Sequence, residues 1–242
     1  MFRPVLLLCI LLICLSGCQS SKENTSNTTF KVSFSDNISS KAQDGRLLLM
    51  LSTNDENEPR FQINSGLNTQ LIFGMNVDGM TPNSEHIFDA SNFGFPYTSL
   101  EEVPPGEYWV QALLHVYETF NLSTGHTVKL PMDNGEGQKW NRSPGNMYSK
   151  PFKVTIPENR DLEIAVVMDQ VIPPIEEPED TEWIKHIKIR SEKLSEFWGR
   201  DMYLGAHVLL PKGFQDHPEA KYPLMIYHGH FPDDFGGFRT DP

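Results

Sequence analysis

Cysteine is scarce in this chain and is confined to its start. The only cysteines among the 242 residues are Cys9, Cys14 and Cys18, so the sequence after Cys18 can form no internal disulfide. Basic residues are also few, because 20 lysines and arginines against 32 aspartates and glutamates leave a net charge of −12. Binding to nucleic acid needs clustered cationic side chains, so this balance argues against a nucleic acid partner.

A long hydrophobic run and a serine nucleophile motif are missing as well. The apolar run from Val5 to Leu15 is too short to span a bilayer, which needs roughly 20 apolar residues. None of the 17 glycines is followed two positions later by serine. The chain therefore lacks the Gly-x-Ser-x-Gly turn that carries the nucleophile of α/β-hydrolases.

The first residues are typical of an exported protein. The apolar run follows Arg3 and ends in Leu15-Ser16-Gly17-Cys18, which resembles the lipobox of bacterial lipoproteins. The resemblance implies a signal peptide over residues 1–17 and lipidation of Cys18, which would anchor the protein to a membrane. Gln19 follows Cys18, a pattern that in Gram-negative lipoproteins implies the outer membrane of the bacterial cell envelope. The alternative is an ordinary signal peptide with an incidental cysteine.

Residues 18–29 and 30–169 differ sharply in composition. The first segment is polar and rich in Ser, Asn and Thr, which predicts a flexible tether. The second alternates apolar segments with Gly, Pro and Asn turns, which predicts a mainly β chain folded as an immunoglobulin-like β-sandwich. The expected strands cover residues 30–35, 46–53, 61–63, 71–77, 107–118, 126–130, 152–156 and 162–168. Residues 107–118 are apolar enough for either a helix or a strand, and their Tyr, Trp and Val content favours a strand.

A segment rich in proline and acidic residues follows the predicted sandwich. Residues 170–181 contain three prolines and four acidic side chains, which predicts an extended, solvated linker between two domains. The stretch 182–242 then begins a second region, with expected strands at 183–190, 202–210 and 222–227 and an expected turn at 195–200.

The second region contains an ordered series of motifs. Leu210-Pro211-Lys212-Gly213-Phe214 is followed by a polar loop and by an apolar segment that starts at Tyr222-Pro223 and ends at His228-Gly229. This series resembles the opening of an esterase domain of the α/β-hydrolase class. More widely, residues 30–242 resemble bacterial envelope proteins that place a β-rich region before such a domain. The resemblance implies carboxylic-ester hydrolysis by the complete protein.

The resemblance also implies an oxyanion loop at His228, Gly229, His230 and Phe231. A tetrahedral intermediate develops negative charge on oxygen, backbone N–H groups after this strand can face it, and glycine allows close approach. The alternative is a simple turn that ends a strand.

The sequence also predicts that the hydrolase domain is incomplete. The nucleophile motif is absent, and a hydrolase sheet needs more than the remaining 60 or so residues. We therefore expect that the chain is the N-terminal portion of a longer protein and is inactive by itself.

Two functions of different class fit these patterns. The first is an envelope-anchored serine esterase that acts on a small ester or a glycan ester. The second is a non-catalytic binding or scaffolding lipoprotein in which the sandwich is the functional part.

Other residue groups give weaker signals, and no cofactor is expected. His228 and His230 lie one residue apart with His217 nearby, but no third ligand stands at motif spacing, so a metal site is not favoured. The loop from Gly135 to Trp140 could bind a sugar, although packing of Trp140 on the sandwich is the favoured interpretation. Three other histidines are expected to have structural rather than catalytic roles, namely His86, His115 and His126.

Overall fold

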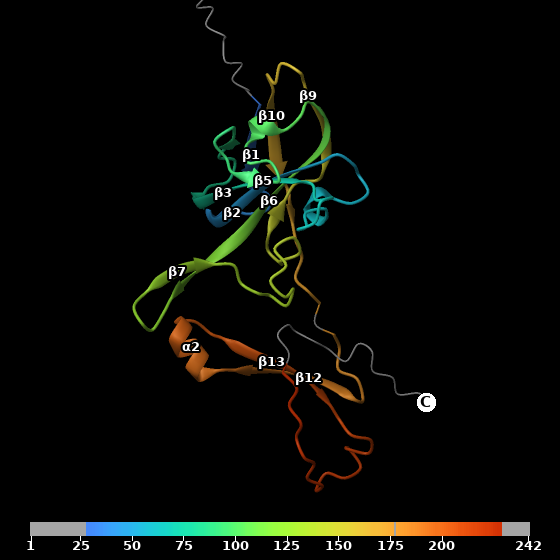
Figure 1. The fold of residues 1–242 in the computed structure, drawn as a ribbon. Coiled ribbons are helices and arrows are strands. Elements are labelled where there is room, and N and C mark those ends of the chain that lie inside the picture. Colours follow the sequence, from blue (N-terminus) through green and yellow to red (C-terminus); the bar gives the residue numbers. More distant parts are fainter. Residues whose placement is uncertain (1–27, 177, 229–242) are drawn as a thin grey trace, which may run out of the picture.

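A computed structural model describes residues 28–176 and 178–228 of the chain. The described part is mainly β, with a β-sandwich followed by a hairpin that carries one short helix (Figure 1). No helix within these two ranges combines the length and the hydrophobicity needed to cross a bilayer.

Two sheets form the sandwich. The strands of the larger sheet are β2 (Gln43–Ser52), β3 (Leu71–Met80), β5 (Gly94–Phe95), β6 (Gly106–Asn121), β8 (Met147–Tyr148) and β11 (Gln170–Val171), and its order is β11-β8-β6-β2-β3-β5. Two further strands, β7 (Thr127–Leu130) and β9 (Phe152–Ile156), also pair with β6. The smaller sheet has the order β10-β1-β4 and is formed by β10 (Glu163–Met168), β1 (Thr29–Phe34) and β4 (His86–Phe88). Strand β1 runs antiparallel to β4 and parallel to β10.

The main core lies between the two sheets. Phe30, Val32 and Phe34 alternate along β1 and are fully buried, as the sequence alternation predicts. They meet the odd-numbered residues Leu47, Leu49 and Leu51 of β2 in one hydrophobic cluster. The sandwich therefore follows from apolar side chains that both sheets direct into a shared interior.

A second, smaller hydrophobic cluster covers the outer face of the larger sheet. Leu48 and Met50 of β2 point into it with Leu113 and Ile172, so β2 is buried on both faces as its dense apolar run predicts. Trp140 packs against this cluster from the loop between β7 and β8, in agreement with the favoured interpretation of that loop. The Gly135–Trp140 loop therefore uses its tryptophan for packing.

Strand β6 is long and leaves the sandwich at its far end. Its central residues pair with β2, which resolves the helix-or-strand ambiguity in favour of a strand. Beyond the sandwich, Glu118–Asn121 pairs with β7 to form a protruding hairpin of residues 118–130, named here the β6–β7 arm (Figure 1). The Lys129 ammonium connects this arm to the sandwich through ion pairs with the carboxylates of Asp44 (2.8 Å) and Asp78.

Several elements differ from the sequence prediction. Residues 59–61 form a 3-10 helix, η1 (Pro59–Phe61), where a strand at 61–63 was expected. No strand is predicted between residues 77 and 107, but this stretch contains β4 and β5, and a second 3-10 helix, η2 (Leu100–Glu102), precedes β6. Residues expected to begin the linker belong to the sandwich, because Gln170 and Val171 pair with β8 and the N–H of Ile172 donates to the carbonyl of Asn146.

Candidate functional site

Residues 183–228, in the second region predicted from the sequence, form a small unit below the sandwich, named here the C-terminal module (Figure 1). Its strands β12 (Ile184–Arg190) and β13 (Tyr203–Leu209) pair antiparallel over their full lengths. Between them lies helix α2 (Glu192–Trp198), which overlaps the turn predicted at residues 195–200. The helix forms because Ser191 caps its first turn and Gly199 ends it in the left-handed conformation.

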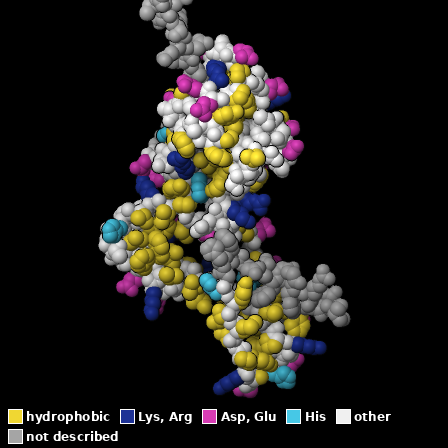
Figure 2. Space-filling view, in the orientation of Figure 1, with side chains coloured by type: hydrophobic (Ala, Val, Ile, Leu, Met, Phe, Trp, Pro, Cys, Tyr) yellow, Lys and Arg dark blue, Asp and Glu magenta, His cyan; other side chains and the backbone are white. Residues whose placement is uncertain are grey.

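The hairpin has one mixed face, with polar residues beyond the pair Ile184–Leu209, and one mainly apolar face. His186, Lys188 and Arg190 share a face with their partners His207, Gly205 and Tyr203, because directly opposed residues project to the same side. The opposite face is mainly apolar, with Lys185 at one end, and its members Ile187, Ile189 and Leu204 are 42%, 56% and 54% exposed. Figure 2 shows such hydrophobic side chains at the surface of the lower part of the molecule. The hairpin therefore presents an uncovered apolar surface.

The segment after the hairpin is also uncovered. Residues 222–227 have no regular secondary structure and pair with no strand of the described chain, which corrects the prediction of a buried strand. Leu224, Met225, Ile226 and Tyr227 are 80–89% exposed. The local sequence favours a strand, but the described residues supply neither a neighbouring strand nor a covering layer.

The C-terminal module contacts the sandwich through α2 and the β6–β7 arm. The indole of Trp198 packs edge-on against the ring of Phe120, with 5.2 Å between ring centroids. The guanidinium of Arg200 lies 4.8 Å from the centre of the same Phe120 ring and pairs with the Glu118 carboxylate. The Ser123 N–H completes the contact by donating to the carbonyl of Phe197 (2.7 Å). Packing, charge and backbone hydrogen bonding thus hold α2 on the arm.

A histidine pair lies on the mixed face of the hairpin. The rings of His186 and His207 are 4.6 Å apart between centroids, and the Asp180 carboxylate lies 3.1 Å from Nδ1 of His186. The backbone N–H of His186 also donates to that carboxylate (2.8 Å), which holds the pKa of Asp180 below its usual range. This contact joins the end of the linker to the first strand of the hairpin, so we assign it a structural role. Sequence reasoning missed it because the two residues carry no motif.

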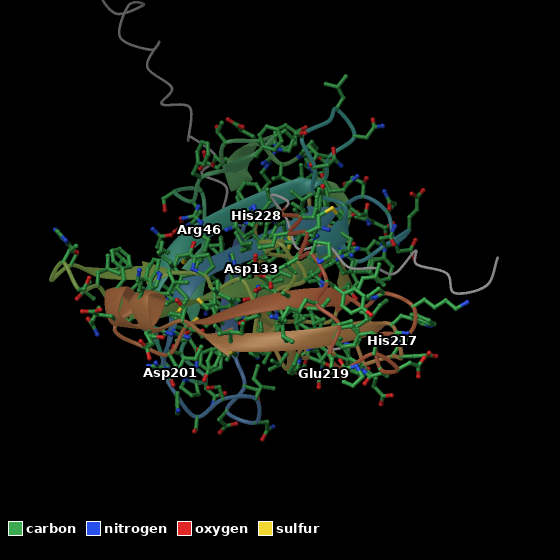
Figure 3. The ribbon with its side chains drawn as sticks, turned by 90° about the horizontal axis from the view of Figure 1, so that it is seen from below. Arg46, Asp133, Asp201, His217, Glu219 and His228 are labelled. Carbon is green, nitrogen blue, oxygen red and sulfur yellow. The ribbon has the colours of Figure 1, made fainter. Side chains whose placement is uncertain are left out.

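The predicted oxyanion loop is only partly within the described residues. His228 is the last of them and is exposed, while Gly229, His230 and Phe231 lie outside the described ranges, as does the predicted lipidation site Cys18. Figure 3 shows His217 and Glu219 at one end of the hairpin and His228 well apart from them. The structure therefore does not bring His217 and His228 together, and no group of three metal-ligating side chains occurs in residues 28–176 and 178–228.

A network of polar side chains surrounds the 3-10 helix η1. Arg60 is buried beneath the aromatic rings of Phe61 and Tyr148 and forms an ion pair with Glu58 (2.8 Å). Gln111 extends this network, because its amide donates to Glu58 (2.7 Å) and to the carbonyl of Ser149 (2.9 Å). Each buried charge has its partner, so this cluster stabilises the loops around η1.

Two of the histidines expected to be structural are influenced by burial. His86 lies on β4 and His115 on β6, and burial lowers the pKa of each imidazole below its usual range. The ring of His115 also packs edge-on against Tyr117 at 5.5 Å. Neutral, packed imidazoles of this kind stabilise the sandwich only while they remain unprotonated.

Comparison with protein-family models, with curated proteins and with solved structures found no match to this chain. The functional conclusion therefore depends on the motifs and on the geometry described above.

Proposed function

We propose that this chain is the N-terminal portion of an envelope-anchored bacterial serine esterase. In this proposal an immunoglobulin-like sandwich carries the opening strands of an α/β-hydrolase sheet. The observation that supports it best is the exposed apolar surface of the C-terminal module, which coincides with the residues that resemble the esterase domain.

The exposed apolar side chains of the C-terminal module are consistent with a larger sheet, in which further strands and helices would cover them. A two-stranded hairpin is marginally stable alone, and contiguous exposed apolar surface marks a place where another layer packs. In α/β folds helices cover both faces of the sheet, so strands carry apolar side chains on each side. Ile187, Ile189 and Leu204 match this requirement on one face of the hairpin, and residues 224–227 match it in the next segment.

The lack of pairing between residues 222–227 and β13 also agrees with the proposal. In doubly wound sheets consecutive strands are often not neighbours, because later strands insert between them or the order reverses. A third strand can therefore follow β13 in sequence while its hydrogen-bonding partners come from later elements. The proposed hydrolase sheet would bury residues 222–227 in this way.

The proposed chemistry is acyl transfer through a serine nucleophile. His228 and Gly229 would end the third strand, and the N–H of His230 or Phe231 would stabilise the oxyanion of the tetrahedral intermediate. The nucleophile, its base and the acid that orients the base are not assigned in this sequence, which has no Gly-x-Ser-x-Gly motif. The substrate would be a small ester or a glycan ester.

The proposed location is the outer membrane, with the lipid on Cys18. Replacing Cys18 by serine should move the protein from the membrane fraction to the soluble fraction. A Cys18→Ser variant that stays with membranes after washing at high salt would overturn the anchor proposal.

The catalytic proposal is tested in two steps. The 242-residue chain should not hydrolyse p-nitrophenyl acetate above the blank rate, whereas a protein extended by the downstream reading frame should. In the extended protein, Gly229→Val should lower kcat about a hundredfold, the scale of one lost oxyanion donor. Gly205→Ala is the matched control, since a Cβ there meets no atom within 4 Å. Turnover by the 242-residue chain that a serine-directed phosphonate inhibits would contradict the assignment.

The alternative proposal is a non-catalytic binding lipoprotein in which the sandwich is the functional part. One feature of the sandwich favours a binding role, an open depression between two loops near β3 and β6. A continued reading frame without a nucleophile motif would decide for this alternative.

A further inference from the structure

The sandwich carries an open depression of about 410 Å³ between two loops that are distant in sequence. One wall is the segment that leads into β3, with Leu67, Asn68 and Gln70. The other wall is the chain before and at the start of β6, with Tyr97 and Tyr108. The volume falls within the usual range of small-molecule sites, roughly 300–1,000 Å³.

The aromatic wall is held in place by the fold. Tyr108 is 6% exposed, and its hydroxyl donates to the carbonyl of Pro104 (2.9 Å). Tyr97 is half-buried and packs against the main core. Leu71, 7% exposed, also lines the depression and belongs to the same core. Tyr108 and Leu71 expose little surface themselves, but their packing in the core fixes the wall on which Tyr97 stands, so the site is largely preformed.

Several polar groups in the depression are free to bind a ligand. The Gln70 carbonyl oxygen accepts hydrogen bonds from the N–H (2.9 Å) and the hydroxyl (3.2 Å) of Thr53, which fixes the side chain. Within residues 28–176 and 178–228, the Gln70 amide nitrogen, the Asn68 side chain and the Tyr97 hydroxyl have no hydrogen-bond partner. Together they offer both donors and acceptors.

The charge of the lining sets the class of ligand. Not one of the ten lining residues carries a charge, although 21% of the chain is charged. Anionic and cationic ligands would find no counter-charge, and a purely apolar ligand would leave the amides unpaired. Amides, phenol hydroxyls and aromatic rings together match a molecule that has many hydroxyl groups on an uncharged ring.

We propose that this depression on the sandwich binds a neutral saccharide through Asn68, Gln70, Tyr97 and Tyr108. The site is separate from the hydrolase-like residues, so it does not depend on the esterase proposal. It also differs from the sugar-binding loop considered at Gly135–Trp140, whose tryptophan packs on the outer face of the larger sheet.

The test is a titration of the full 242-residue chain, labelled with ¹⁵N, with cellotetraose and with xylotetraose. At least one of them should shift the backbone amide signals of residues 67–71 and of Tyr97. Tyr97→Phe keeps the ring and its packing but removes the hydroxyl, and should weaken binding about three- to tenfold, the worth of one hydrogen bond. Gln70→Ala should weaken binding to a similar extent. Tyr222→Ala in the C-terminal module is the control and should leave the affinity unchanged.

Three results would overturn the proposal. The first is the absence of amide shifts at residues 67–71 with both saccharides at 10-fold molar excess and at millimolar concentration. The second is unchanged affinity in both Tyr97→Phe and Gln70→Ala, each shown by its spectrum to be folded. The third is tighter binding of the anionic polygalacturonate tetramer at the same amides, because the argument depends on an uncharged ligand.

Discussion

Replacing Gly199 by alanine should loosen the contact between the C-terminal module and the β6–β7 arm. Gly199 ends α2 with φ of 66°, a left-handed conformation that costs an L-residue roughly 1–2 kcal/mol. An added Cβ would also lie 2.5 Å from the backbone oxygen of Asn121 on the arm. Real Cβ atoms do not approach backbone oxygens so closely, and opening the contact relieves the overlap.

The Ser123 amide reports directly on this contact, because its N–H donates to the Phe197 carbonyl across the interface. Its hydrogen can exchange with solvent only when that bond opens. If the substitution weakens the contact between α2 and the arm by about 1.4 kcal/mol, the equilibrium constant for opening this contact rises tenfold. The Gly199→Ala variant should therefore exchange the Ser123 amide hydrogen at least about tenfold faster than the parent chain, as measured by NMR.

Gly213→Ala provides the matched control for this experiment. Gly213 also has a left-handed φ, 75°, but the nearest atoms to its added Cβ belong to its own loop at 3.7 Å. It should carry the same backbone strain and leave Ser123 exchange unchanged. Unaltered exchange in Gly199→Ala would refute the contact between α2 and the arm.

Three further predictions concern stability and accessibility. Gly45→Ala should destabilise the sandwich by about 3 kcal/mol or more in urea unfolding, because its Cβ would lie 2.1 Å from the His115 oxygen, whereas Gly205→Ala should change stability by less than about 0.5 kcal/mol. Burial lowers the pKa of His86 and His115, so unfolding free energy should be constant above about pH 7 and fall as pH drops through 6.5, less steeply in His115→Gln. Limited proteolysis with a Glu-specific protease should cut first at the exposed residues Glu176, Glu179 and Glu182, and equally fast cutting at Glu107 or Glu118 within β6 would contradict this.

Strands defined by a strong local pattern could be predicted from the sequence. The alternation of β1 and the dense apolar run of β2 translate directly into burial on one face and on both faces. Helix α2 carries both cap signals, Ser191 and Gly199, but its seven residues are too few for a helical period to emerge. The apolar-polar alternation of residues 61–63 predicts a strand, whereas η1 forms there around Arg60, whose burial among residues distant in sequence has no local signature.

The candidate sites were harder to predict because they depend on contacts between distant segments. Asn68 and Tyr97 line one depression only because β3 and the chain before β6 reach the same end of the sandwich. Residues 222–227 are the reverse case, in which the sequence predicts an element that the structure lacks. Their composition is typical of a strand, but pairing requires a partner that the described chain does not supply. Composition sets a propensity, and topology decides whether it is realised.

The parallel pairing of β1 with β10 has a mechanical consequence. Thr29 at the start of β1 lies opposite Glu163, and Phe34 at its end lies opposite Met168. A pulling force applied between the residues before Thr29 and those after Met168 acts along both strands in opposite directions. It loads the interstrand hydrogen bonds together, in shear, instead of unzipping them one by one. The sandwich should therefore resist tension between its two ends better than a hairpin of the same length.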